Sequence, residues 1–354
     1  MLITLDEYER AFHWEYRFHF RDAVVRDRNI FSFIVEPSLT EAQERDERKK
    51  GGDHNLRPKG VRIFNRSAEP GKMWSGRWLQ NWEAMVCGSA KNPLNQVIQV
   101  EASPVYPSME RRVLVSGSGP AYQDLSLGSS ELEVGDARFI RGRIGKIKEI
   151  DGYAYVAAGG RSFGRRLGKG QWESFSHLFA HSLSTDAISE EGFRDFDGWS
   201  AEDIYLVGGL GDLWHFDGAS ARRISLSYDY PLHSVCCGGD GRVYVSGMSG
   251  DTWVGRGDQW TRIRSLGLSL PLRDMVWYED RAWGTNDHGV YWIQNDTLQI
   301  AELPPEASVC AGNLSAADGV LLIAGLGGAV FRENGRWTPL VLFDDMERIR
   351  ASKA

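Results

Sequence analysis

The feature of this sequence that most constrains its fold is a repeat with a constant period. Four segments align without a gap, and each carries a glycine at the same place; the glycines are 39 residues apart and are Gly211, Gly250, Gly289 and Gly328. Three residues after each glycine stands a large ring: Trp214, Trp253, Trp292 and Phe331. Looser copies surround Gly119 and Gly164. A period near 40 indicates a repeat architecture whose units stack on one another.

Each repeat predicts strands rather than helices. Its apolar runs are short, rich in β-branched and aromatic residues, and separated by Gly or Asp, as in HSVCC, RVYVSG, DTWVG and QWTRIRSL. Four strands in about 40 residues are typical of one blade of a β-propeller. We therefore predict an all-β chain whose residues 1–354 form a single β-propeller domain. The expected blades are 30–87, 96–140, 143–175, 192–226, 232–265, 272–303 and 307–342, the regular ones lying within 96–342; seven four-stranded blades are favoured, with six as the alternative.

The N-terminal segment has a different pattern. Phe12, Trp14, Tyr16, Phe18 and Phe20 alternate with polar residues, which predicts a strand with one aromatic face. A turn at Arg26–Asn29 leads to a second strand, so we expect residues 1–36 to form a β-hairpin extension that closes the ring or caps an open blade edge. Residues 38–52 are polar all round and predict an exposed helix. The charged tail after Phe343 is expected to be peripheral.

The repeat pattern resembles that of a known group of propellers. Each unit has a β run, then Gly-x-x-Gly, a ring, and a polar turn followed by Trp, as at Trp172, Trp260 and Trp337. Over residues 96–342 this is similar to the degenerate repeats of Asp-box (sialidase-type), photosystem-assembly-factor-like and quinoprotein-like propellers. The nearest approach to an Asp-box, Ser249–Trp253, lacks its spacing. The resemblance implies a fold and no particular activity.

Charge and composition exclude several classes of protein. The chain has 41 basic and 48 acidic residues, a net charge of −7, which disfavours nucleic-acid and membrane-surface binding. Its start, MLITLDEYER, lacks the basic and apolar parts of a signal peptide, so a cytoplasmic location is expected. Four cysteines are too few for a disulfide scaffold.

Motifs for chemistry are weak. His177 and His181 are four residues apart, but no acid lies between them and no helix is predicted. Cys236 and Cys237 alternate on an expected inner strand and so point to opposite faces. Glycine clusters near Gly159 and Gly168 precede no helix, which a phosphate site needs. We expect no catalytic residues, no metal and no cofactor.

The repeat suggests a binding face. In a propeller, the turn between the second and third strands opens on the same side as the links between blades, and here those positions are unusually apolar or aromatic. The candidate partner-binding residues are Phe163, Leu210, Tyr228, Asp229, Tyr230, Met248, Asp287, His288 and Leu326. Large apolar and tyrosine side chains with a polar rim are typical of protein interfaces. The alternative is that these side chains fold back and cap the ring channel.

Three functions fit these patterns. The first is a non-enzymatic protein-binding module, specifically an immunity protein, or antitoxin, that neutralises a basic toxin domain and is a monomer outside that complex. The second is a carbohydrate-active propeller enzyme, hydrolase or lyase, that uses the ring centre. The third is an assembly factor that holds another protein during maturation.

Overall fold

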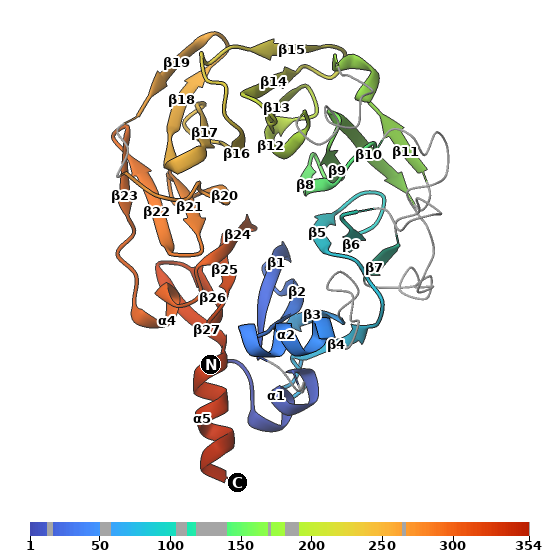
Figure 1. The fold of residues 1–354 in the computed structure, drawn as a ribbon, viewed down its shortest axis with the longest axis vertical. Coiled ribbons are helices and arrows are strands. Elements are labelled where there is room, and N and C mark those ends of the chain that lie inside the picture. Colours follow the sequence, from blue (N-terminus) through green and yellow to red (C-terminus); the bar gives the residue numbers. More distant parts are fainter. Residues whose placement is uncertain are drawn as a thin grey trace. The chain divides into compact units, whose positions relative to one another are not determined.

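The structure is a computed structural model that describes residues 1–12, 17–49, 58–103, 112–117, 140–168, 171–180, 191–263 and 267–353. Seven antiparallel sheets follow one another along the chain, each a meander of consecutive strands (Figure 1). Six have four strands, and β5–β7 shows three within the described residues. The chain is a seven-bladed β-propeller, as the repeat predicts, and the six-bladed alternative is wrong. Trp14, Tyr16, Gly119 and His181 lie outside the described residues.

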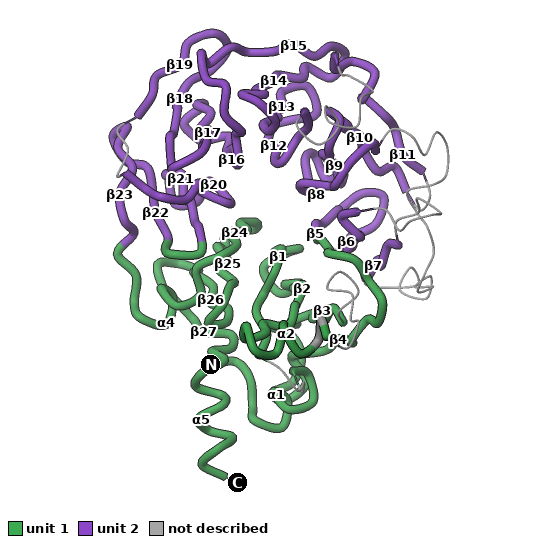
Figure 2. The backbone as a smooth tube through the Cα atoms, viewed as in Figure 1, with its two compact units in different colours: residues 1–87, 287–289, 302–354 green, residues 88–286, 290–301 purple. Residues whose placement is uncertain are grey.

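The chain forms two compact units, which Figure 2 distinguishes by colour. Unit 1 contains residues 1–87, 287–289 and 302–354, and unit 2 contains residues 88–286 and 290–301.

Unit 1 carries two blades and the helices. Its first blade has the strands β1 (Arg17–Asp27), β2 (Ile30–Ser38), β3 (Lys59–Asn65) and β4 (Trp74–Leu79). The other has β24 (Gly312–Ala317), β25 (Val320–Gly325), β26 (Gly328–Glu333) and β27 (Arg336–Leu342). The helices are α1 (Leu5–Phe12), α2 (Glu41–Lys49), α4 (Pro305–Ser308) and α5 (Phe343–Lys353).

The N-terminal hairpin is not an extension. β1 and β2 pair across a tight turn in which Asp27 Oδ1 accepts hydrogen bonds from the backbone N–H groups of Asn29 (2.9 Å) and Ile30 (3.1 Å). This local pairing uses both strands in the first blade, so neither completes the last blade, whose four strands all come from its own segment. The first blade therefore begins at Arg17 and ends at Leu79, not at 30 and 87.

The two blades of unit 1 are joined through aromatic packing. Phe12, at the end of α1, and Phe18 and Phe20, on β1, surround Phe343 with ring centroids 4.8–5.8 Å apart. Phe343 and Met346 of α5 are buried in the same cluster. The start of the C-terminal helix is therefore part of the core, because Phe343 and Met346 lie one turn apart on the same side, whereas residues 348–353 are exposed.

Unit 2 carries the remaining blades. The strands are β5 (Met85–Ala90, which starts in unit 1), β6 (Gln96–Glu101), β7 (Val113–Gly117), β8 (Ile144–Ile150), β9 (Tyr153–Ala158), β10 (Ser162–Gly168), β11 (Gln171–Ser174), β12 (Phe193–Ser200), β13 (Asp203–Gly208), β14 (Asp212–Phe216), β15 (Ala221–Ile224), β16 (Leu232–Cys237), β17 (Val243–Gly247), β18 (Thr252–Arg256), β19 (Gln259–Arg262), β20 (Asp274–Tyr278), β21 (Arg281–Asn286), β22 (Gly289–Gln294) and β23 (Thr297–Ile300). Short 3₁₀ turns occupy Ser176–Leu178 and Met248–Gly250.

The repeated rings lie on the third strand of each blade. Trp214, Trp253 and Phe331 are buried, whereas Trp292 is only partly covered. An arginine lies over each ring, at 5.4 Å for Arg161 on Trp214 and 6.0 Å for Arg262 on Trp253. The repeated ring therefore has a packing role: a flat side chain lies between its neighbours in the sheet and an arginine side chain.

Candidate partner-binding face

Three of the predicted binding residues are the exposed apolar side chains of one region of unit 2. Leu210 is 49% exposed, Tyr230 63% and Met248 41%. Leu210 lies in the β13–β14 turn, Met248 in the β17–β18 turn, and Tyr230 in the link between β15 and β16. We call Leu210, Tyr228, Tyr230 and Met248 the turn patch, and the side of unit 2 that carries these turns the turn face.

Tyr228 is the half-buried base of the turn patch. Its ring centroid lies 4.5 Å from that of Trp253 and 5.5 Å from that of Tyr230. The ring also covers Gly247, where a Cβ atom would lie 2.9 Å from it, and the backbone of Met248 hydrogen-bonds to the Tyr228 hydroxyl. Burial raises the pKa of Tyr228, so the phenol is neutral. The exposed side chains are thus supported by a packed aromatic pair.

A glycine joins the link to the neighbouring turn. Gly211 N–H donates to the carbonyl of Tyr230 (3.0 Å), and Gly211 has a φ of +64°. A Cβ atom there would lie 1.8 Å from the carbonyl oxygen of Tyr228. Only glycine fits this approach and this conformation; Gly250 and Gly328 of the repeat also have a positive φ, of +72° and +136°.

The sequence analysis missed two residues that adjoin the turn patch. Arg194, at the start of β12, places a guanidinium nitrogen 3.2 Å from Nε2 of His233, at the start of β16. The same His233 atom lies 3.3 Å from Sδ of Met248. Burial, and then the charge of Arg194, lowers the pKa of His233 to about 4, so the imidazole is neutral near pH 7. Arg194, His233 and Met248 form a continuous row on the turn face.

A short motif would have found both residues. An apolar residue, then Arg or His, then Asp or Ser recurs at the start of inner strands: Phe20-Arg21-Asp22, Phe193-Arg194-Asp195, Leu232-His233-Ser234 and Leu272-Arg273-Asp274. The first and third members are buried in all four copies. In the first three copies the strand register shifts at the middle residue, a β-bulge. A bulge re-aims one side chain, and here it turns the middle residue outward.

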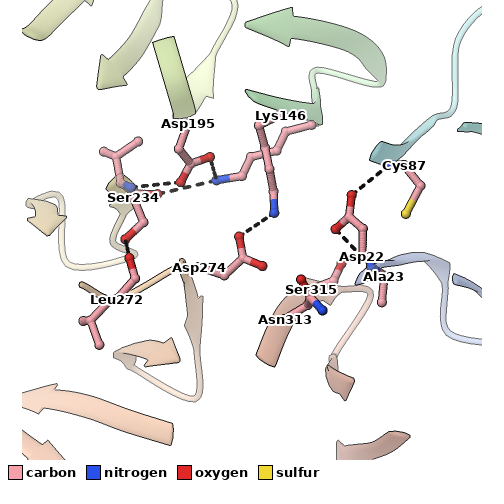
Figure 3. Close-up of polar contacts among 12 residues, drawn as sticks. Asp22, Ala23, Cys87, Lys146, Asp195, Ser234, Leu272, Asp274, Asn313 and Ser315 are labelled. Carbon is pink, nitrogen blue, oxygen red and sulfur yellow. Dashed lines mark hydrogen bonds and ion pairs between the residues drawn. The ribbon is translucent and has the colours of Figure 1, made fainter. Parts of the chain in front are cut away.

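The third member of this motif bonds to another inner strand (Figure 3). In unit 2, Asp195 Oδ2 accepts from the Val235 N–H (2.9 Å), and the Ser234 hydroxyl donates to the Leu272 carbonyl (2.9 Å). In unit 1, Asp22 accepts from the Cys87 N–H (2.8 Å). These buried polar groups are satisfied by backbone and join blades, so their role is structural.

Buried ion pairs occupy the space between the inner strands of unit 2. Lys146 on β8 pairs with Asp274 on β20, three blades further along the chain, and Lys148 pairs with Asp195 at 2.9 Å. All four side chains are at least four-fifths buried. Each charge is thus neutralised by a partner on another blade.

The remaining predicted binding residues are not part of the turn patch. Phe163 is fully buried, with ring centroids 5.4 Å from Phe196 and 5.6 Å from Phe216, so its assignment to an exposed face is wrong. Phe163 lies on β10, and its strand position directs the ring into the core of unit 2. Asp229 is exposed within the unit 2 link, whereas Asp287, His288 and Leu326 are exposed residues of unit 1.

Other chemistry finds little support among the described residues. Burial raises the pKa of Cys236 and Cys237 well above its ordinary value, which leaves both thiols protonated and unreactive. Within the described ranges, no three His, Cys, Asp or Glu side chains gather as a metal site requires. The helices described are all too short or too polar to cross a membrane.

Comparison with known proteins gives one relative by sequence. A protein named "Immune protein Tsi7", from Pseudomonas aeruginosa, is 26% identical over 240 residues, which cover 68% of this chain and 74% of that protein. No family model matches the chain.

Comparison with solved structures gives similar folds, a β-propeller domain among them. The WD40 β-propeller domain of Doa1 has a TM-score of 0.60 at 11% identity and covers 92% of this chain and 97% of its own. YCF48 bound to D1 peptide has a TM-score of 0.55 at 14% identity, with 90% and 93% covered. Saccharomyces cerevisiae Sqt1 has a TM-score of 0.54 at 12% identity, with 92% and 85% covered. At these identities the likeness shows the fold alone.

Proposed function

We propose that this chain is an immunity protein that acts in the cytoplasm by binding a protein toxin and blocking it. The observation that carries the proposal is the 26% identity, over 240 residues, to a protein named as an immune protein. A propeller suits the task because its rigid blades present loops on a fixed scaffold.

The turn patch supplies the binding surface in this proposal. Tyrosine and other large side chains at the centre of an interface contribute most of the binding free energy when they are supported and become fully desolvated. Tyr230 and Met248 are exposed; Tyr230 packs on Tyr228, which packs on Trp253, and the Met248 backbone hydrogen-bonds to the Tyr228 hydroxyl. Such pre-organised anchors lose little conformational entropy on binding.

The net charge of −7 favours a basic toxin. Complementary net charge accelerates encounter over a screening length of about 8–10 Å at physiological salt. Asp229 and Asp287 are exposed acids that contribute to this attraction. Outside the complex we expect a monomer.

The other two functions have less support. A carbohydrate-active enzyme would use the space between the inner strands, where Lys146–Asp274 and Lys148–Asp195 already pair. An assembly factor rests on the resemblance of the repeats alone, since the likeness to YCF48 bound to D1 peptide shows only the fold.

Co-expression tests the proposal. The chain is produced in bacterial cells together with the protein encoded by the adjacent gene, and survival is scored with and without it. We expect the chain to rescue growth and to form a stable complex in size-exclusion chromatography. Toxicity that the wild-type chain fails to relieve, with no complex formed, contradicts the proposal.

A further inference from the structure

Resting on the proposed function, we propose that Arg194 is an anchor of the toxin interface and that it binds a carboxylate of the toxin, an Asp or Glu side chain beside an apolar one. The inference deepens the proposed function because it names the chemistry that the toxin must offer to the turn face.

The fold directs Arg194 outward. Phe193 pairs with Gly208 and Asp195 with Val207, so Arg194 is the extra residue of a β-bulge. Its neighbours Phe193 and Asp195 are buried, whereas Arg194 is exposed. An inner-strand residue that would otherwise face a neighbouring blade is therefore presented to solvent.

The position of Arg194 is also rigid. A Cβ atom on Gly145 would lie 2.5 Å from the Arg194 carbonyl oxygen, so the backbones of β8 and β12 touch at this residue. The guanidinium lies against both ring nitrogens of His233, at 3.2 and 3.3 Å, and His233 contacts Met248. A cation held in place loses little side-chain entropy when an anion binds.

The charge of Arg194 is unbalanced in the free protein. Nearby arginines of the turn face have carboxylate partners: Arg161 and Arg223 pair with Asp212, and Arg262 pairs with Asp251. Arg194 has none among the described residues, and its polar contact is a neutral imidazole. Burial lowers the pKa of Arg194, which shows that the cation is already partly desolvated.

A partly desolvated, fixed arginine gains more from a carboxylate than a fully solvated one does. The guanidinium of Arg194 has already lost part of its hydration in the free protein. The desolvation free energy that usually opposes an interfacial ion pair is therefore smaller. The planar guanidinium also binds a carboxylate through two parallel hydrogen bonds. Met248 lies beside it, which explains why the carboxylate should have an apolar neighbour.

The chain would attract its partner in two ways, one that acts at long range and one that acts on contact. The overall charge of −7 draws a basic protein from a distance, whereas Arg194, beside the turn patch, meets the partner with a positive charge. A basic toxin that presents one acidic residue within an apolar surface satisfies both conditions.

Binding measurements with the purified product of the adjacent gene test the inference. We expect Arg194→Ala to raise Kd at least about 30-fold, as for truncation of one partner of a desolvated charge pair. Arg194→Lys should lose less affinity, since lysine keeps the charge but cannot form two parallel hydrogen bonds with a carboxylate. Arg222→Ala is the matched control, because Arg222 is a half-exposed arginine of the same unit that pairs with Asp258; its Kd should change less than twofold.

The toxin side identifies the carboxylate. Each Asp and Glu of the toxin is changed in turn, and one of them should lose affinity with wild-type chain but not with Arg194→Ala, the signature of direct coupling. Melting temperatures of the free variants should match that of the wild type.

The outcomes are distinct. If Arg194→Ala binds the toxin as wild type does while Tyr230→Ala does not, the inference is wrong and the proposed function stands. If wild-type chain fails to bind or neutralise the toxin, the proposed function fails and the inference with it. If a short single-stranded oligonucleotide binds wild type tightly and Arg194→Ala removes that binding, the ligand is a phosphate and the carboxylate assignment is overturned.

Discussion

The two faces of unit 2 differ in what they leave exposed, although both carry ion pairs, such as that of Arg161 with Asp212 on the turn face. On the face opposite the turn patch, where β12–β13 and β14–β15 turn, arginines join neighbouring blades through ion pairs. Arg256 meets Asp203 at 2.6 Å, Arg242 meets Asp296 at 2.7 Å, and Arg222 meets Asp258 at 2.5 Å. On the turn face, apolar side chains are exposed and Arg194 faces a neutral histidine.

The difference indicates which face has its polar and apolar groups already in contact with other groups of the free protein. Ion pairs between blades satisfy the first face internally, so a partner would have to break them. On the turn face, the Tyr230 ring and the Arg194 guanidinium are exposed and can contact a partner. Exposed apolar groups rimmed by charge commonly mark an interaction surface.

Removing the support of the turn patch should have the largest effect. Trp253→Ala deletes a buried ring that packs under Tyr228, so we expect a loss of about 3–5 kcal/mol in the free energy of unfolding, measured by urea denaturation, together with loss of the toxin complex. Trp292→Ala, at the equivalent and partly exposed position, is the control and should lose clearly less. Equal losses would mean that Trp253 is no better packed than its counterpart.

Changing the surface of the turn patch should separate binding from stability. Met248→Asp should abolish the complex, and Tyr230→Ala should cost about 2 kcal/mol of binding free energy, the level of an interface hot spot. Both residues are exposed, so the melting temperature should stay nearly unchanged. Ile300→Asp, at a residue that is 70% exposed and outside the turn patch, is the control. Complex formation by Met248→Asp would move the interface elsewhere.

Breaking an ion pair on the opposite face should affect stability only. Arg256→Ala removes the pair with Asp203 and the contact with the Trp199 ring at 4.4 Å. Arg256 is half-exposed, so the expected loss is at most about 1 kcal/mol, seen as a small shift in the urea midpoint that shrinks in high salt. Toxin affinity should not change; a large drop would show that the partner contacts both faces.

Acid should weaken the turn face through His233. The folded-state pKa is about 4 and the ordinary value 6.5, so below pH 6.5 the unfolded chain binds a proton that the folded chain does not. Stability from this residue is therefore complete above pH 6.5 and declines down to about pH 4. His233→Gln should show a shallower fall in melting temperature between pH 7 and 5, and parallel curves would contradict the assignment.

Several features were open to prediction from sequence because they rest on local pattern. The glycines before Trp214 and Trp253 and the alternation of the strands predict four-stranded blades, since close turns and flat packing require those residue types. The blade spans from 143 onward match the strands observed. Leu210, Tyr230 and Met248 were found for the same reason, since large apolar residues stand where a turn normally has polar ones.

Other features depend on partners distant in sequence. The aromatic alternation and the turn at Arg26–Asn29 predict a hairpin, and β1 does pair with β2. They do not predict that this hairpin supplies the first two strands of a blade, or that β1 packs against the last blade and α5. Phe163 was expected at a turn like the others, yet it lies on β10 and its ring packs on Phe196 of the next blade. The sign of the charge beside Met248 was also hidden, because Arg194 is 54 positions away in the chain.

By itself, then, the sequence determined the all-β class and the blade period, because turn glycines, strand alternation and flat rings act within one hairpin. Only the tertiary structure decided which residues the turn face exposes, because burial depends on how neighbouring blades pack. It also decided that Arg194 stands beside His233 and Met248, since a β-bulge and a contact between two blades place them together.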